Sequence, residues 1–322
     1  MYLSYEPIQK VSLIILAYKN YYNLSACIKS VINQTYSNIE LIFADDCTPG
    51  LDKENVENTI LSLNSNKYPI CFLFNSENKG TVKNFNNAIE HSTGELIVPV
   101  SIDDQLSDRY AIGKIVEHFN KEHLLLGTSY SCCVKEKQYC ICPSSKELKT
   151  LNNDKTANEL LTMGLFFKGA NTYYHRRVFE LYGMFNEEYK LYEDVPFMLK
   201  YLENGGSVGV VPYVCILYSM NGQGVSSKKN VNKLLVEDRK RMYDEVLHNS
   251  KYRRVHRWVR YNLYRNVYPN NDIEAVLKFA DIIMLKTIKI MILHKRWMNY
   301  SNMDELINNI KKVNQIIEQR VD

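Results

Sequence analysis

The chain has 322 residues, 45% hydrophobic and 24% charged, which is enough to bury the core of one large α/β domain with an appendage or of two modest domains. The formal net charge of +4 is unevenly spread: residues 1–227 carry 20 Lys and Arg against 25 Asp and Glu, whereas residues 228–322 carry 20 against 11. Residues 1–10 lack the basic and apolar regions of a secretory signal. The longest apolar stretch, residues 281–293, contains two lysines and is too short to span a bilayer.

The first hundred residues alternate apolar, strand-like runs with amphipathic, helix-like segments. Predicted strands lie within 10–20, 39–50, 68–75 and 95–102, and predicted helices lie within 22–36, 52–66 and 80–94. Four strands separated by helices and short loops predict an α/β fold with a doubly wound, mostly parallel sheet. In such sheets, ligands bind beyond the carboxyl ends of the strands.

The remainder of the chain gives a weaker pattern up to residue 165, with a helix near 109–120 followed by short strands. Further helices are predicted at 176–185 and 193–205, and a strand at 207–220. From about residue 229 the pattern is helical, with long amphipathic stretches and no strand signal. We therefore divide the chain into an α/β domain, residues 1–228, and a basic helical region, residues 229–322.

Two pairs of carboxylates follow predicted buried strands. Asp45 and Asp46 end one strand, and Asp103 and Asp104 end another. Adjacent like charges repel, and burying one of them without a partner is costly. A divalent cation bound to a diphosphate takes one or two such carboxylates, whereas the simpler interpretation of each pair is a helix N-cap. Lys83, in the first turns of the helix after residues 78–80, faces the same edge and is a candidate to steady a pyrophosphate.

The eight cysteines are scattered along the chain. Cys27, Cys71 and Cys215 lie inside apolar segments, which favours reduced core thiols over a disulfide framework. Four others resemble metal-ligand spacing only loosely, and ordinary strand or loop cysteines are the simpler interpretation. These four are Cys132, Cys133, Cys140 and Cys142.

Several segments together resemble family 2 glycosyltransferases with the GT-A fold, in the right order over roughly residues 10–225. They are VSLIILAYKNYYNLSACIKSVINQTYSNIELIFADDCT, ENKGTVKNFNNAIEHSTGELI, SIDD and MFNEEYKLYEDVPFMLKYLENGG. The resemblance implies transfer of a hexosyl or N-acetylhexosaminyl group, with inversion, from a UDP-linked donor to a hydroxyl of a glycan or lipid-linked glycan. It also implies a role in making a bacterial cell-surface polysaccharide.

The resemblance also implies roles for individual residues. Asp103 stands in the D-x-D position as the metal ligand, with Asp104 close to the donor. Asp194 is the usual candidate for the catalytic base, and Glu193 is its neighbour. The implied contacts with the nucleotide and its diphosphate come from Ala17, Tyr18, Asp45, Asp46 and Lys83, the last standing where such enzymes often have an Arg.

Two departures from the family pattern weaken the predicted metal site, which would hold Mn²⁺ or Mg²⁺: Ser101 replaces the first Asp of D-x-D, and residues 218–227 lack a His. A further departure is Lys19, which stands where the family usually has Asn, although Asn20 follows at once. A catalytically inactive subunit for sugar-nucleotide binding or assembly is therefore an alternative. A nucleotidyltransferase ranks lower, because its Gly-rich loop is missing from LAYKNYYN.

The chemistry of the reaction fits these residue types. A carboxylate takes the proton from the acceptor hydroxyl, a cation neutralises the departing diphosphate, and the site aligns the two substrates. No covalent intermediate is needed, and the sequence has no evident Ser-His or Cys-His arrangement.

The basic region predicts a further partner. Residues 251–265 hold six Lys or Arg with interleaved aromatic residues, and no nucleic-acid recognition motif accompanies them. This composition favours an anionic membrane surface, which implies a cytoplasmic protein, peripheral on the inner face of the membrane. The alternative is that the C-terminal helices pack against the catalytic domain or form a homodimer.

Overall fold

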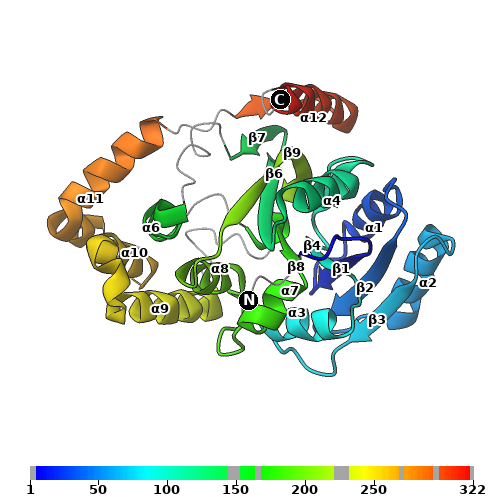
Figure 1. Ribbon diagram of the computed structural model, residues 1–322, viewed down its shortest axis with the longest axis horizontal. Helices are drawn as coiled ribbons and strands as arrows, with labels where there is room; N and C mark the ends of the chain where they lie inside the picture. Colours follow the sequence, from blue (N-terminus) through cyan, green and yellow to red (C-terminus); the bar gives the residue numbers. More distant parts are fainter. Residues whose placement is uncertain are drawn as a thin grey trace.

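The protein, seen here as a computed structural model, is described over residues 5–143, 153–163, 168–220, 232–267, 272–292 and 297–319. These residues form one curled sheet with helices on both faces, and the last four long helices run along one side and over the top of the view (Figure 1). Parallel neighbours account for most of the paired strand residues. The predicted α/β fold with a mostly parallel sheet is confirmed.

The first half of the sheet contains four parallel strands in the order β4–β1–β2–β3. Its elements are β1 (Val11–Ala17), α1 (Leu24–Ile32), β2 (Ile39–Asp45), α2 (Lys53–Asn64), β3 (Ile70–Phe74), α3 (Thr81–Glu90) and β4 (Leu96–Ser101). In register, Ala17 lies opposite Asp45 and Leu16 lies opposite Ser101. The carboxyl ends of β1, β2 and β4 therefore meet at one edge of the sheet.

The alternation of side chains along β1 explains why helices cover both faces. Leu13 and Ile15 belong to the core that includes α1 and α2, whereas Ile14 belongs to the core that includes α3. All three side chains are fully buried. Each contributes roughly 1.5–3 kcal/mol relative to an exposed position, so the strand is held from both sides.

The second half of the sheet is more irregular. Its elements are β5 (Gln105–Leu106), α4 (Ala111–Glu122), β6 (Leu126–Lys135), β7 (Gln138–Cys142), α6 (Asn153–Met163), η1 (Gly169–Asn171), β8 (Thr172–His175), α7 (Arg177–Tyr182), α8 (Asp194–Glu203) and β9 (Val208–Ser219). β9 runs parallel to β6 with a register shift beside Tyr130, and it pairs with β5 just beyond β4. This pairing brings the end of β9 to the carboxyl end of β4.

Most of the C-terminal helices share cores with the sheet and with the helices that precede them. They are α9 (Lys233–His248), η2 (Ser250–Val255), α10 (His256–Val267), α11 (Asp272–Ile292) and α12 (Met303–Glu318). Met242 and Val259 belong to the same core as α3, and Leu306 packs with residues of β6 and β9. The predicted domain boundary at residue 228 lies outside the described residues, so the division into two domains stays a prediction.

One expectation for this region is wrong. The sequence shows no strand signal after residue 229, but β10 (Met298–Asn299) pairs antiparallel with β7. A two-residue strand is too short to produce an alternating pattern, and its pairing depends on a distant hairpin. Among the described residues, none of the helices has both the length and the apolarity needed to cross a bilayer.

Candidate active site

The carboxyl end of β4 holds two carboxylates in different surroundings. Asp104 is buried, and one of its oxygens accepts a hydrogen bond from the backbone N–H of Ser219, 2.8 Å away on β9. Burial, together with the charge of Asp103, raises the pKa of Asp104 well above its usual range. Asp103 is partly exposed and accepts a hydrogen bond from the Ser101 hydroxyl. Ser101 thus orients the candidate metal ligand.

Lys168 lies beside the candidate site and is not predicted from the sequence. Its ammonium lies 4.2 Å from the centre of the Tyr218 ring and 2.8 Å from the Sγ of Cys133. Its positive charge also lowers the pKa of Asp104, against the larger effect of burial. A lone Lys before an irregular segment gives no sequence signal, because its role depends on strands that precede and follow it by dozens of residues.

Glu193 and Asp194 begin α8, where the helix dipole favours negative charge. Burial, and then the charge of Asp194, raises the pKa of Glu193 to about 8. Burial also raises the pKa of Asp194, although the backbone N–H of Val195 donates to its carboxylate at 2.8 Å. The helix start alone therefore does not offset the desolvation of two adjacent carboxyl groups, and the pKa of each is raised.

Gly169 allows the chain to approach this carboxyl pair closely. A Cβ at this position would lie 2.7 Å from Oε1 of Glu193, well inside normal contact. The backbone N–H of Gly169 also lowers the pKa of Asp194 by hydrogen bonding. Since Lys168 acts on Asp104 and Gly169 contacts Glu193 and Asp194, two consecutive residues link the two acidic motifs.

Tyr218 and Arg239 complete the surroundings of these carboxylates. After burial, the charges of Asp104, Asp103 and Asp194 all contribute to raising the pKa of the Tyr218 phenol. Arg239, on α9, lowers the pKa of Asp194 through its positive charge. The predicted metal ligand and the predicted base therefore share one neighbourhood, and a helix of the basic region contributes to it.

The carboxylates at the end of β2 are held by their own loops. Asp45 accepts hydrogen bonds from the Tyr21 hydroxyl at 2.8 Å and from the backbone N–H of Thr48 at 2.9 Å. Asp46 accepts from the backbone N–H groups of Lys79 and Gly80, both at 2.8 Å. Both carboxylates are buried and fix the loops after β2 and β3. Their predicted contact with a nucleotide stays a prediction.

The other predicted nucleotide contacts lie nearby. The backbone carbonyl of Ala17 accepts from the N–H of Asp46 at 3.0 Å, and Tyr18 is partly exposed just beyond β1. Lys83 forms an ion pair with Glu187 at 3.6 Å and lines a groove along α3. Its predicted contact with a pyrophosphate also stays a prediction.

The acidic pair on β4 suits a hard divalent cation. Within the described residues, no His and no third carboxylate joins Asp103 and Asp104 in a ligand cluster. Mg²⁺ and similar ions in nucleotide sites use one or two carboxylates and take their other ligands from phosphate oxygens and water. Asp103 and the buried Asp104 offer carboxylate oxygens in this number, so the pair fits the requirement.

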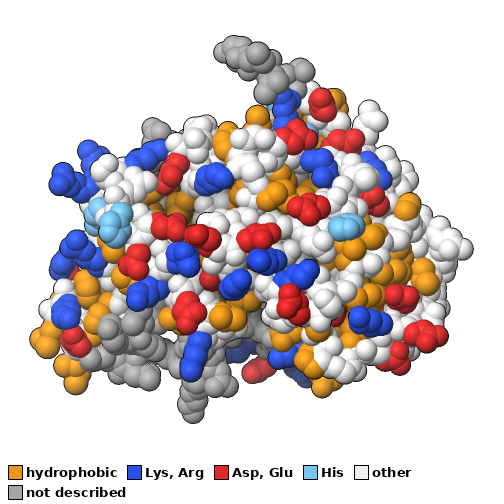
Figure 2. Space-filling view, turned by 90° about the horizontal axis from the view of Figure 1, so that it is seen from below, with side chains coloured by type: hydrophobic (Ala, Val, Ile, Leu, Met, Phe, Trp, Pro, Cys, Tyr) orange, Lys and Arg blue, Asp and Glu red, His pale blue; other side chains and the backbone are white. Residues whose placement is uncertain are grey.

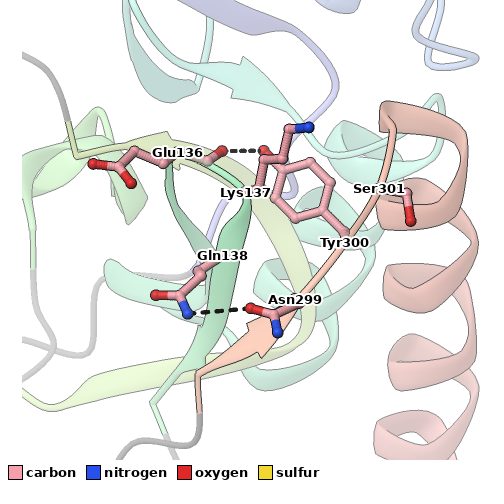
Figure 3. Close-up of a pocket in the computed structure, with 6 residues that line it drawn as sticks. All are labelled: Glu136, Lys137, Gln138, Asn299, Tyr300 and Ser301. Carbon is pink, nitrogen blue, oxygen red and sulfur yellow. Dashed lines mark hydrogen bonds between the residues drawn. The ribbon is translucent and has the colours of Figure 1, made fainter.

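A second cavity lies away from this neighbourhood, between the β6–β7 hairpin and the residues after β10. Gln138 donates to Asn299 at 3.1 Å and the Tyr300 hydroxyl donates to the carbonyl of Glu136 at 2.8 Å (Figure 3). Its other lining residues are Lys137 and Ser301. None of the predicted site residues lines it, so we do not assign it to the reaction.

Comparison with known proteins identifies related sequences. The family model of glycosyl transferase family 2 matches residues 12–183, which is more than half of the chain. A relative described as an uncharacterized glycosyltransferase of Haemophilus influenzae is 26% identical over 231 residues, covering 68% of this chain and 68% of that protein.

Comparison of structures gives the same type of fold. S. aureus TarS 1–349 in complex with UDP-GlcNAc superposes with a TM-score of 0.61 at 17% identity, covering 96% of this chain and 92% of that one. The chain spans 45% of a longer TarS chain. A mannosyltransferase of Pyrobaculum calidifontis in complex with GDP-Man and Mn²⁺ superposes with a TM-score of 0.58 at 14% identity, covering 88% and 77%. The GT-A fold predicted from the sequence is confirmed.

Proposed function

Because the chain belongs to glycosyltransferase family 2, we propose that it transfers a sugar from a UDP-linked donor to a hydroxyl group, with inversion at the sugar. The acceptor is a glycan or a lipid-linked glycan, and the sugar is a hexosyl or N-acetylhexosaminyl group. The observation that carries the proposal is the shared neighbourhood of Asp104 and Asp194. Ser219 donates to Asp104, its neighbour Tyr218 contacts the Lys168 ammonium, and Gly169 lies against Asp194. The fold shared with TarS, which was solved with UDP-GlcNAc, supports the choice of donor.

The acid pair on α8 provides the proton acceptor. Glu193, with a pKa raised to about 8, holds a proton at neutral pH and acts as a hydrogen-bond donor. Asp194 then remains as the base that takes the proton from the acceptor hydroxyl. Its raised pKa brings it closer to the working pH, which improves a general base. Gly169 lets the backbone pack against this acid pair, because a Cβ there would clash with the Glu193 carboxyl.

The donor end of the site lies at β4. A divalent cation, Mn²⁺ or Mg²⁺, held by Asp103 would supply charge neutralisation for the departing diphosphate. Ser101 orients the Asp103 carboxylate, and Ser219 holds that of Asp104 through its backbone N–H. Lys168 adds a fixed positive charge beside Asp104.

A screen of nucleotide sugars for hydrolysis, with Mn²⁺, with Mg²⁺ and with chelator, tests this proposal. We expect one class of donor to release nucleoside diphosphate, and the metal to stimulate the release. A folded protein that binds a nucleotide sugar but neither hydrolyses nor transfers it would instead be the inactive binding subunit.

We further propose that the basic region lies reversibly against an anionic membrane, on the cytoplasmic face. Arg253, Arg254 and Arg260 are exposed, whereas Arg257 forms an ion pair with Asp281 at 2.7 Å. Figure 2 shows Lys and Arg side chains along the left edge of the molecule, the side on which α9 and α10 lie in Figure 1. α11 adds an exposed apolar stripe of Ile273, Leu277, Met284, Ile288 and Met291.

Co-sedimentation with anionic liposomes tests this part. Each exposed Arg contributes roughly 1 kcal/mol near an anionic surface, and salt screens the attraction. We expect binding at low salt, release at high salt, and loss of binding when Arg253, Arg254 and Arg260 are changed to Glu. The same charge change at three exposed lysines elsewhere, Lys29, Lys121 and Lys137, is the matched control.

Sedimentation equilibrium of the same variants separates the membrane from a homodimer. Deleting the region would remove buried residues such as Met242 and Val259 from the core, so point variants are preferable. A salt-independent dimer that the arginine variants dissociate, without liposome binding by the wild type, would contradict the membrane proposal.

A further inference from the structure

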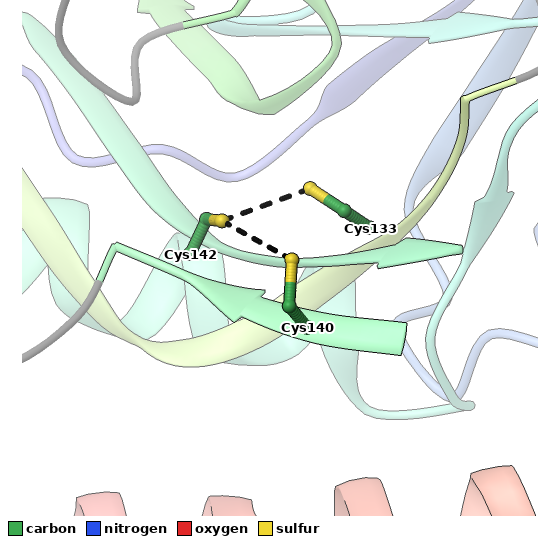
Figure 4. Close-up of side chains that lie close together, drawn as sticks. All are labelled: Cys133, Cys140 and Cys142. Carbon is green, nitrogen blue, oxygen red and sulfur yellow. Dashed lines mark hydrogen bonds between the residues drawn. The ribbon is translucent and has the colours of Figure 1, made fainter. Parts of the chain in front are cut away.

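Three cysteines from one β-hairpin bring their sulfur atoms together. Cys133 on β6 lies directly opposite Cys140 on β7, and Cys142 is two residues further along β7 on the same face. The Sγ of Cys142 lies 3.8 Å from that of Cys133 and 3.9 Å from that of Cys140 (Figure 4). All three sulfurs lie within 4.8 Å of one another.

The fourth cysteine of this segment does not take part. Cys132 precedes Cys133 and therefore points to the opposite face of β6, where it packs with Tyr130 and Leu306. The three clustered cysteines form a separate group with the side chains of Tyr218 and Met220 at their edge. Strand alternation thus selects three of the four cysteines that the sequence leaves open.

The sulfur separations match those of a metal–thiolate site. Zinc–sulfur bonds of about 2.3 Å at a tetrahedral angle put two sulfurs about 3.8 Å apart. The two close pairs already have this spacing, and the third needs only a small adjustment. We propose that Cys133, Cys140 and Cys142 bind one thiophilic divalent cation of the zinc class.

The charges around the cluster favour a divalent over a monovalent ion. Three thiolates and a divalent cation together carry one negative charge, and the Lys168 ammonium beside Cys133 compensates it. A monovalent ion would leave a net negative charge among buried side chains, where Cys133 is 4% exposed and Cys142 is fully buried.

The surroundings of the three sulfurs already favour metal binding, and they set the number of protein ligands. The Lys168 ammonium donates to the Sγ of Cys133 at 2.8 Å, so a positive charge already faces one of the three sulfurs. Within the described residues, no fourth Cys, His or carboxylate joins the cluster. Three protein ligands leave one coordination position for an exchangeable ligand such as water.

This site is chemically distinct from the acidic pair on β4. Thiolates select soft or borderline ions, whereas carboxylates suit Mn²⁺ and Mg²⁺. The cluster also joins β6 to β7, so a bound ion stabilises the hairpin whose strand β6 adjoins β9. The inference does not depend on the proposed glycosyl transfer, and its failure would leave that proposal intact.

The test is a titration of the full-length, reduced protein with Co²⁺, followed by competition with Zn²⁺ against a chromophoric chelator. We expect one equivalent per chain, with the near-ultraviolet absorption of a thiolate–cobalt bond. Cys133→Ser and Cys142→Ser should each weaken zinc binding about 100-fold or more, since each removes a ligand. Cys132→Ala, the adjacent cysteine on the other face, is the matched control and should bind as the wild type does.

Near-ultraviolet circular dichroism establishes that each variant is folded, and the wild-type titration needs no variant. Asp103→Asn should retain the site, because its carboxylate belongs to the oxygen site. The proposal is overturned if folded wild type binds no zinc, or if Cys142→Ser binds it as tightly as Cys132→Ala does. It is also overturned if the cysteines are joined by a disulfide in freshly purified protein, since that leaves too few thiolates.

Discussion

The pKa of a buried carboxyl group is shifted in opposite directions at the two ends of the parallel strands. Near the amino end, the buried Glu40 carboxylate accepts from Ser12 at 2.6 Å and from Thr93, and it pairs with Lys10 at 2.7 Å. Burial alone would raise its pKa, but these partners outweigh burial and lower it to about 2. At the carboxyl end, burial raises the pKa of Glu193 to about 8.

The difference separates a structural carboxylate from those proposed to be functional. The partners of Glu40 belong to the fold and stabilise its ionised form. Asp104, Glu193 and Asp194 lack comparable compensation, so they destabilise the folded state when ionised. Residues that reduce stability without a packing role are typical of sites whose missing partner is a substrate or ion.

The largest expected effect concerns the proposed base. Asp194→Asn should lower sugar transfer by about 10²–10⁴-fold and leave donor binding unchanged, because only the proton acceptor is lost. Steady-state transfer and nucleotide titration measure the two quantities. Glu188→Gln, which changes an exposed carboxylate on the same segment, is the control. Transfer by Asp194→Asn at the wild-type rate would assign the base to another residue, with Glu193 first.

The next effect concerns the donor end. Asp103→Asn should reduce metal-stimulated donor hydrolysis by about 100-fold, because it removes a ligand of the cation that neutralises the leaving diphosphate. Thermal unfolding should be unaffected, since Asp103 is only partly buried. Hydrolysis that keeps its full metal stimulation in this variant would contradict the metal assignment.

Near the amino end of the strands, Glu40→Gln should destabilise the protein by about 2–3 kcal/mol at neutral pH. The folded-state pKa of Glu40 is lowered, so its contribution is complete above the unfolded value near 4.5 and is lost as the pH falls toward 2. Denaturant unfolding at several pH values should therefore show the variant and the wild type converging over that range. A constant difference down to pH 2 would mean that the charge of Glu40 is not what stabilises the fold.

Glu193→Gln should change stability with the opposite sign, and only above acidic pH. The folded-state pKa of Glu193 is raised, so the folded protein holds a proton that the unfolded chain loses between about pH 4.5 and 8. Wild-type stability should fall over this range, and the variant should gain stability relative to it as the pH rises to 8. If the variant gains no stability relative to the wild type as the pH rises, burial does not destabilise the ionised carboxyl pair.

The periodicity of apolar residues predicts the strands of the sheet and the carboxylates that follow them. The alternation of Leu13, Ile14 and Ile15 predicts a strand buried on both faces, and β1 has that arrangement. Asp103 and Asp104 directly follow such a run, so their position at a strand end could be predicted from local sequence alone. Tertiary structure adds what local sequence lacks, namely that Asp104 contacts Ser219.

The part that sequence could not predict consists of contacts between distant segments. Lys168 and Arg239 come from an irregular segment and from a helix of the basic region, and neither lies in a recognisable motif. The thiol cluster is an intermediate case. The spacing of its cysteines left four candidates open, and the pairing of β6 with β7 decided that Cys132 lies apart.

We propose that a divalent cation, shared between Asp103 and a nucleoside diphosphate, supplies the positive charge that the carboxyl end of the sheet lacks. Calorimetric titration of UDP, with and without Mn²⁺, tests it directly in wild type, Asp103→Asn and Glu40→Gln. We expect Mn²⁺ to strengthen the binding of UDP in wild type and in Glu40→Gln. In Asp103→Asn, Mn²⁺ should no longer strengthen it. Equal affinities with and without Mn²⁺ in all three proteins, or no binding of UDP or of any other nucleoside diphosphate, would contradict it.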